Sequence, residues 1–319
     1  MKRAMTFLMV GLLLLATNAQ AVPNGQARTD REQDRLFGSV QSVKTELAEF
    51  IAKDGKQIEG PRMPVQTVTY DTRGNRMKLV DFNRDGSVAQ TLIYHYDTEG
   101  RSMGYEDYMP GLSTARKHVY VLDQNGKRTE YKMIQPTGTP GEEKYLYKYD
   151  ANGNRVTEEL WHKTSLMSRN ENTYDNQGRL ISQTIYNPDG SVSARIKNVL
   201  AADGKPTERT RYDGDLLTYK VRYAYDRKGK LMEVETTGSY VETNSDTEGF
   251  NAGKVVYLYS GKDQPKEMSI FNPDGSLRER IVADYDSHGN WTKRTHLIRS
   301  AQKGKELPQQ IEYRTITYH

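Results

Sequence analysis

The chain repeats a short phrase, Tyr-Asp-x-x-Gly, at a nearly constant spacing, and this repeat limits the fold more than any other feature. The glycine position of the phrase recurs at residues 74, 100, 126, 153, 178, 204, 229, 263 and 289, with Asp263 in place of glycine. The intervals are 26, 26, 27, 25, 26, 25, 34 and 26 residues. Such a period is typical of arrays built from one supersecondary unit. The chain is therefore expected to form one repetitive structure.

A second turn signal lies about midway between these marker positions. Examples are Asp85-Gly86, Asp189-Gly190 and Asp274-Gly275, and such pairs supply the positive backbone angles of tight hairpins. The segments between turns are rich in Tyr, Val, Thr and Ile and alternate in polarity, which is the pattern of a strand. Each unit is predicted to be a strand, a turn, a second strand and a second turn.

Alignment of the units on the marker gives three columns of mostly large side chains. Four residues before the marker stand Tyr70, Tyr96, Leu122, Tyr149, Tyr174, Leu200, Tyr225, Tyr259 and Tyr285. A second column, two residues earlier, lies on the same strand face because side chains alternate. A third column, eight residues after the marker, includes Phe82, Trp161 and Tyr186. The tyrosine of the phrase is predicted to face the core, and the aspartate to begin the turn with its carboxylate accepting backbone N–H groups.

Two further strands are expected before the first marker, from Gly38 and from Arg62, and a last one from Gln310. The fold class is therefore all-β, a repetitive antiparallel meander of about 20 strands, because one hairpin cannot bury its own face and stacked hairpins can. Open sheets rarely exceed about ten strands without curling. We expect one domain over residues 37–319, curled into a coil, a trough or a wide barrel.

The first 21 residues have the pattern of a signal peptide. Lys2 and Arg3 precede an apolar run over residues 5–16, and Ala19-Gln20-Ala21 is a small-x-small cleavage site. The run is shorter than the roughly 20 residues that cross a bilayer. We expect cleavage after Ala21, a polar lead-in over residues 22–36, no later transmembrane segment, and a periplasmic or secreted protein.

Composition excludes several kinds of site. The chain has no cysteine, which rules out disulfides and thiolate catalysis. The formal charge of +4 includes Lys2 and Arg3, so +2 remains after loss of the leader. Acidic and basic residues alternate instead of forming basic blocks, which disfavours nucleic-acid binding.

The phrases "YDTEGR" at residue 96, "YDANGNR" at 149, "YDNQGRL" at 174 and "YDSHGNW" at 285 resemble those of the RHS/YD-repeat family. The resemblance covers roughly residues 65–295. It implies a shell of strands like those that enclose a toxin domain in large members. This chain is far shorter and ends in a strand, so the toxin role does not carry over. The resemblance implies a small stand-alone secreted member.

No catalytic residues, cofactor or metal site are predicted. The six histidines form no close pair of the His-x-x-x-His type, and the oxygen-rich stretches 150–153 and 187–190 are explained by hairpin turns. No nucleophile elbow, phosphate loop or zinc-protease motif is present. A transmembrane barrel is disfavoured because residues 205–212, "KPTERTRY", are polar on both strand faces.

The function expected is therefore a non-catalytic scaffold that binds a partner protein or a glycan. The alternatives are a carbohydrate-binding module, a carbohydrate-active enzyme, or a purely structural shell. Aromatic side chains in the interior could form a sugar-stacking platform, and Trp161 and Tyr186 are the tentative ligand contacts.

The single long interval, between Gly229 and Asp263, adds eight residues to the usual period. Tyr240 and Phe250 lie there among Gly, Ser, Thr, Asn, Asp and Glu residues. Long loops on rigid scaffolds often carry function, although insertions are also tolerated without one. We expect residues 238–252 to form a protruding loop for partner contact, with Tyr240 and Phe250 as tentative contacts.

Overall fold

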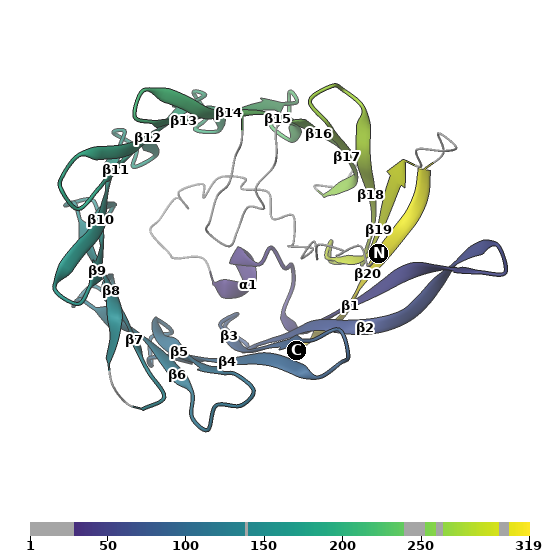
Figure 1. The fold of residues 1–319 in the computed structure, drawn as a ribbon, viewed down its shortest axis with the longest axis horizontal. Helices are drawn as coiled ribbons and strands as arrows, with labels where there is room; N and C mark the ends of the chain where they lie inside the picture. The colour runs from purple at the N-terminus through teal and green to yellow at the C-terminus, as the bar shows by residue number, and fades with distance from the viewer. Residues whose placement is uncertain (1–28, 138–139, 239–252, 260–263, 300–305) are drawn as a thin grey trace, which may run out of the picture.

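The computed structural model describes residues 29–137, 140–238, 253–259, 264–299 and 306–319. Within these residues, twenty antiparallel strands form one sheet that closes into a barrel (Figure 1). The strands are β1 (Val40–Lys53), β2 (Lys56–Tyr70), β3 (Arg76–Phe82), β4 (Val88–Tyr96), β5 (Ser102–Tyr108), β6 (Arg116–Leu122), β7 (Arg128–Ile134), β8 (Pro140–Tyr149), β9 (Arg155–His162), β10 (Ser165–Tyr174), β11 (Leu180–Tyr186), β12 (Val192–Leu200), β13 (Pro206–Asp213), β14 (Leu216–Tyr225), β15 (Leu231–Gly238), β16 (Gly253–Tyr259), β17 (Pro265–Phe271), β18 (Leu277–Tyr285), β19 (Trp291–Arg299) and β20 (Glu306–Tyr318). The all-β prediction is confirmed, and of the three predicted forms the structure is the barrel.

Each strand pairs with the next along the chain, and β20 then pairs with β1 to close the barrel. Val43 of β1 lies opposite Val68 of β2 on one side and opposite Ile316 of β20 on the other. The two strands expected before the first marker and the strand expected at the end of the chain are therefore the three that make the closure.

The turns follow the predicted chemistry of the aspartate. Asp97 Oδ1 accepts hydrogen bonds from the backbone N–H groups of Glu99 and Arg101, at 3.0 and 2.9 Å. Its Oδ2 accepts a third bond from Arg101 Nε at 2.6 Å, and Asp175 repeats this bond with Arg179. One carboxylate thus accepts three hydrogen bonds within the turn of Asp97, which explains why aspartate recurs.

Two constraints favour glycine at the marker positions, as Gly126 illustrates. Its φ of +77° is in the left-handed region that favours glycine. A Cβ at this position would also lie 2.5 Å from Cδ of Arg101, which extends from the preceding turn. The side chain after one marker therefore packs over the glycine of the next, and the turns stack along one rim.

The tyrosine of the phrase ties each turn to the preceding strand. In five repeats its hydroxyl donates to a backbone carbonyl at the start of that strand, at 2.6–2.9 Å. The pairs are Tyr149 to Arg128, Tyr174 to Arg155, Tyr225 to Pro206, Tyr259 to Leu231, and Tyr285 to Pro265. Phenylalanine could not make this bond, so tyrosine contributes both its ring and its hydroxyl where it occupies this position, which Leu122 and Leu200 take in two repeats.

A short helix, α1 (Asp30–Gln33), lies inside the ring of strands (Figure 1). The hydroxyls of Tyr70 and Tyr96 donate to Asp34 and Asp30, both at 2.5 Å. We call the strand face that carries these two tyrosines the inner wall, and the opposite face the outer wall. Residues 29–36 belong to the segment expected as a polar lead-in, and the sequence pattern gave no indication that they contact the inner wall.

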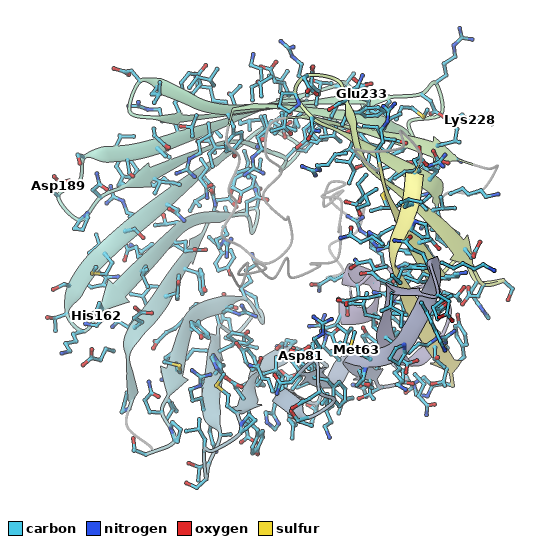
Figure 2. The ribbon with its side chains drawn as sticks, turned by 45° about the vertical axis from the view of Figure 1, so that its right-hand side comes forward. Met63, Asp81, His162, Asp189, Lys228 and Glu233 are labelled. Atoms are coloured by element: carbon cyan, nitrogen blue, oxygen red, sulfur yellow. The ribbon has the colours of Figure 1, made fainter. Side chains whose placement is uncertain are left out.

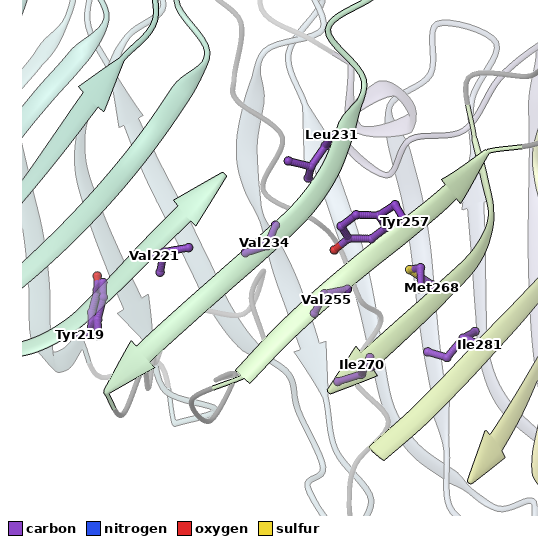
Figure 3. Packing of buried hydrophobic residues seen from close by; sticks show 9 residues of the cluster. All are labelled: Tyr219, Val221, Leu231, Val234, Val255, Tyr257, Met268, Ile270 and Ile281. Atoms are coloured by element: carbon purple, nitrogen blue, oxygen red, sulfur yellow. The ribbon is translucent and has the colours of Figure 1, made fainter. Parts of the chain in front are cut away.

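Buried apolar residues concentrate on the inner wall of β14–β18. We call the following nine residues, each at most 8% exposed, the aliphatic wall: Tyr219, Val221, Leu231, Val234, Val255, Tyr257, Met268, Ile270 and Ile281 (Figure 3). A second cluster joins Leu36 to residues of β1 and β2, with partly buried residues of β20 packed against it. This second cluster lies where the barrel closes.

Candidate functional site

Across the barrel from the aliphatic wall, the inner wall of β4–β8 is aromatic. Tyr94 lies opposite Tyr105, Tyr105 opposite His118, Tyr120 opposite Tyr131, and Tyr131 opposite Tyr145. They lie on the inner wall because Tyr94 is two residues from Tyr96. We call the six residues Tyr94, Tyr105, His118, Tyr120, Tyr131 and Tyr145 the inner aromatic strip.

Neighbouring rings of the strip contact one another across the strands. Their ring centroids are 4.1–5.9 Å apart. Tyr105 and His118 are stacked at 4.1 Å with an angle of 9° between their planes, whereas Tyr131 and Tyr145 are tilted by 57°. Pairs in this distance range stabilise one another by about 0.5–1.5 kcal/mol beyond the area they bury. The strip is therefore a continuous surface with several ring orientations.

The strip is uncharged at neutral pH. Burial raises the pKa of Tyr105, Tyr131 and Tyr145, and burial lowers the pKa of His118. His118 Nδ1 lies 2.7 Å from the hydroxyl of Tyr131. Within the described part of the chain, the hydroxyls of Tyr105 and Tyr145 make no hydrogen bond, and both side chains are partly exposed. The strip thus offers aromatic carbon together with neutral hydroxyls.

Three arginines border the strip. Arg76 Nη1 donates to the hydroxyl of Tyr94 at 3.3 Å, and Arg76 Nη2 pairs with Asp34. Arg116 Nη2 lies 2.5 Å from Asp107 Oδ2. The guanidinium of Arg128 lies 3.3 Å from the ring centroid of Tyr120. These contacts hold the rings in place, and two of the three arginines are paired with a carboxylate.

Trp161 and Tyr186, the ligand contacts expected from the sequence, lie on the outer wall and two strands apart. Trp161 Nε1 donates to Glu159 at 3.0 Å, and the guanidinium of Arg169 covers the ring of Tyr186 at 4.7 Å. The structure does not bring these two residues together with the inner aromatic strip, and their role stays a prediction. Tyr240 and Phe250 lie outside the described residues.

The sequence reasoning recognised only part of the strip. Tyr94 and Tyr120 stand in the column six residues before the marker, but Tyr105, His118, Tyr131 and Tyr145 were not singled out. Tyr105 and Tyr131 both stand five residues after a marker, and His118 and Tyr145 both stand eight residues before one. Alignment of these two further columns would have found them.

A shallow hollow of about 440 Å³ lies at the opposite rim from the Tyr-Asp turns, lined by Tyr108, Lys117, Ile134 and neighbouring residues. Its polar groups pair with one another, since Glu106 accepts from Tyr108 at 2.7 Å and lies 3.4 Å from Lys117. It is a weaker binding candidate than the strip because few of its groups are left to bind a ligand.

Many side chains point outward from the barrel (Figure 2), and on the outer wall of β13–β15 they form ion pairs between neighbouring strands. Glu208 lies 3.1 Å from Lys220 and 3.5 Å from Arg222, and Arg222 lies 3.8 Å from Glu235. Such a surface does not match the apolar band that a lipid-facing barrel presents.

The described residues include no helix long and apolar enough to cross a bilayer. They also include no group of three or more His, Asp or Glu side chains placed to hold a metal ion.

No family model matches the chain, and no curated protein does. Among solved structures, a porin-like protein from Bacteroides uniformis aligns with 88% of this chain and 99% of its own, at 11% identity and a TM-score of 0.39. A porin-like protein from Bacteroides vulgatus aligns with 88% of this chain and 98% of its own, at 12% identity and a TM-score of 0.25. The Tc holotoxin pore of Photorhabdus luminescens aligns over 77% of this chain but only 16% of its own, at 13% identity and a TM-score of 0.30. These scores are too low to support an argument about function.

Proposed function

We propose that the protein is a non-catalytic scaffold of the bacterial envelope or the extracellular space, and that the inner wall of its barrel binds a glycan. Its membership of the RHS/YD-repeat family belongs to the same proposal. The observation that supports a glycan ligand is the inner aromatic strip, a row of partly exposed rings and neutral hydroxyls on β4–β8.

The chemistry of the strip favours a glycan over other ligands. Sugars present C–H faces that pack on aromatic rings and hydroxyls that exchange hydrogen bonds with neutral donors and acceptors. Nucleic acid would need unpaired basic side chains along the surface, whereas the arginine beside His118 is paired with Asp107. A catalytic role would need an acid, base or nucleophile, and burial raises the pKa of the Tyr105 and Tyr131 hydroxyls.

The test is glycan-array binding by the mature protein, followed by calorimetry with the glycan that binds most tightly. Tyr105→Ala and Tyr131→Ala should each weaken binding about tenfold or more, because central aromatic contacts typically contribute 2 kcal/mol or more. Trp161→Ala and Tyr186→Ala are the matched controls on the outer wall and should bind normally.

Two results would count against the proposal. Loss of binding in the Trp161→Ala and Tyr186→Ala variants alone would move the site to the outer wall. If the wild-type protein binds no glycan but captures a protein from an envelope extract, and the strip variants abolish that capture, the inner wall binds a protein partner instead.

A further inference from the structure

Two arginines on the inner wall, one on β19 and one on β20, differ from Arg76 and Arg116, which are paired with carboxylates. Arg294 of β19 lies opposite Glu312, and Arg314 of β20 lies opposite Thr45. Both guanidiniums lie over the ring of Trp291, at 4.2 and 3.9 Å from its centroid. The indole is 6% exposed and forms a floor beneath both cations.

Neither guanidinium has a partner of opposite charge in contact. Within the described part of the chain, Arg294 and Arg314 make no hydrogen bond and no ion pair within 4 Å, and the Nε atom of each is buried without a partner. By contrast, Arg76 Nη2 lies 2.5 Å from Asp34 and Arg116 Nη2 lies 2.5 Å from Asp107. A buried cation without a partner is costly, so this pair lacks an anion that other inner arginines have.

Glu312, the carboxylate opposite Arg294, contacts a histidine. Asp34, whose charge also acts on Arg314, is paired with Arg76. Glu279 Oε1 lies 2.6 Å from His296 Nδ1, and Glu312 Oε2 lies 3.6 Å from His296 Nε2. Burial alone would lower the pKa of His296, but its hydrogen bond with Glu279 and its ion pair with Glu312 raise it to about 9. With His296 protonated, three cations face two carboxylates, and one positive charge is in excess. The tyrosines Tyr70 and Tyr285 that face the group stay neutral, since burial raises their pKa values.

The lowered pKa values of the two arginines agree with an excess of positive charge. Burial, together with repulsion from Arg294, lowers the pKa of Arg314 to about 9. Burial also lowers the pKa of Arg294, although Glu312 opposes the effect. The protein therefore holds this pair at an energetic cost, which one bound anion would offset.

We propose that Arg294 and Arg314 form a binding site for one oxyanion, a carboxylate or phosphate group, on the inner wall above Trp291. The planar fork of arginine matches both groups in bidentate geometry. The site lies away from the inner aromatic strip, which is on β4–β8. It does not rest on the proposed glycan function, and either can fail alone.

The experiment measures the thermal midpoint of the mature protein in inorganic phosphate, in acetate and in glucuronate, each against sodium chloride at the same ionic strength. Ligand that binds only the folded state raises the midpoint, and we expect a rise of about 2–4 °C at saturation. A response to phosphate alone identifies a phosphate site, and a response to acetate and glucuronate alone identifies a carboxylate site.

Arg294→Gln and Arg314→Gln should abolish the response and raise the midpoint of the ligand-free protein, because each removes an unpaired buried charge. Arg169→Gln is the matched control, since Arg169 also lies over an aromatic ring, that of Tyr186, but on the outer wall. It should respond as the wild type does.

The proposal is wrong if no anion stabilises the wild type beyond sodium chloride, or if both glutamine variants keep the response. Should the glutamine variants fail to fold, Arg314→Lys keeps the charge and removes the bidentate fork. It should lose most of the response, and an undiminished response would overturn the assignment.

Discussion

The inner aromatic strip and the aliphatic wall come from the same repeat but have different chemistry. Both regions share the Tyr-Asp turns, the antiparallel register and the tyrosine hydroxyl bond to the preceding strand. On β14–β18 the inward positions are buried and mostly aliphatic, whereas on β4–β8 they are aromatic and partly exposed. The repeated turn residues therefore determine the barrel wall. The inward side chains between the turns can vary, and they determine the chemistry of the inner surface.

The largest expected difference is in packing. Ile270→Ala in the aliphatic wall should lower the free energy of unfolding by about 2–5 kcal/mol, because it leaves a cavity among buried side chains. Tyr145→Ala in the strip should cost about 1 kcal/mol, chiefly its ring contact with Tyr131. Urea unfolding of both variants measures the two values. Equal losses would show that the two walls are packed alike, contrary to this account.

The second expected difference is the direction of pH dependence at two histidines. His296 has a pKa raised from 6.5 to about 9, so its stabilising contribution is full below pH 6.5 and is lost as pH rises through 9. This contribution is about 3 kcal/mol. Burial lowers the pKa of His118, so its contribution is full above pH 6.5 and falls as pH drops below that value.

The free energy of unfolding of the His296→Gln and His118→Gln variants, measured from pH 5 to 10, separates the contributions of the two histidines. The first substitution should remove the loss on the alkaline side, and the second should remove the loss on the acid side. An unchanged alkaline profile in His296→Gln would show that its bonds to Glu279 and Glu312 are not the cause.

The smallest expected effect concerns the tyrosine hydroxyl bond to the preceding strand, which the two regions share. Tyr149→Phe beside the strip and Tyr259→Phe beside the aliphatic wall should each cost about 1 kcal/mol, the net value of one hydrogen bond. Tyr108→Phe is the control, because Tyr108 is exposed and its hydroxyl donates to the side chain of Glu106, and its loss should be smaller. If the two tyrosine substitutions differ widely, the bond is not a common device of the repeat.

The repeat made the strands, the turns and the role of the turn aspartate predictable, because each depends on residues close in sequence. Closure of the barrel was one of three predicted forms, since the pairing of Val43 with Ile316 joins the two ends of the chain and has no local signal. The contact of α1 with Tyr70 was not predicted for the same reason.

The candidate sites were harder to predict than the fold. Trp161 and Tyr186 were predicted as ligand contacts because they are large aromatic residues, yet the strand register places them on the outer wall. The strip depends on which residues face one another across strands, as Tyr105 faces His118. The pair Arg294 and Arg314 depends on Glu312, the carboxylate opposite Arg294, being in contact with His296 instead, which no single strand reveals.

The central claim is that the ligand binds the inner wall, and thiol labelling tests it most directly. The chain has no cysteine, so Met133→Cys on the inner wall opposite His118 and Tyr186→Cys on the outer wall each report one position. The rate of maleimide labelling is measured with and without the glycan that binds most tightly on the array. We predict that the glycan slows labelling of the Met133→Cys variant and leaves the Tyr186→Cys variant unchanged. Protection of the Tyr186→Cys variant alone would contradict the account.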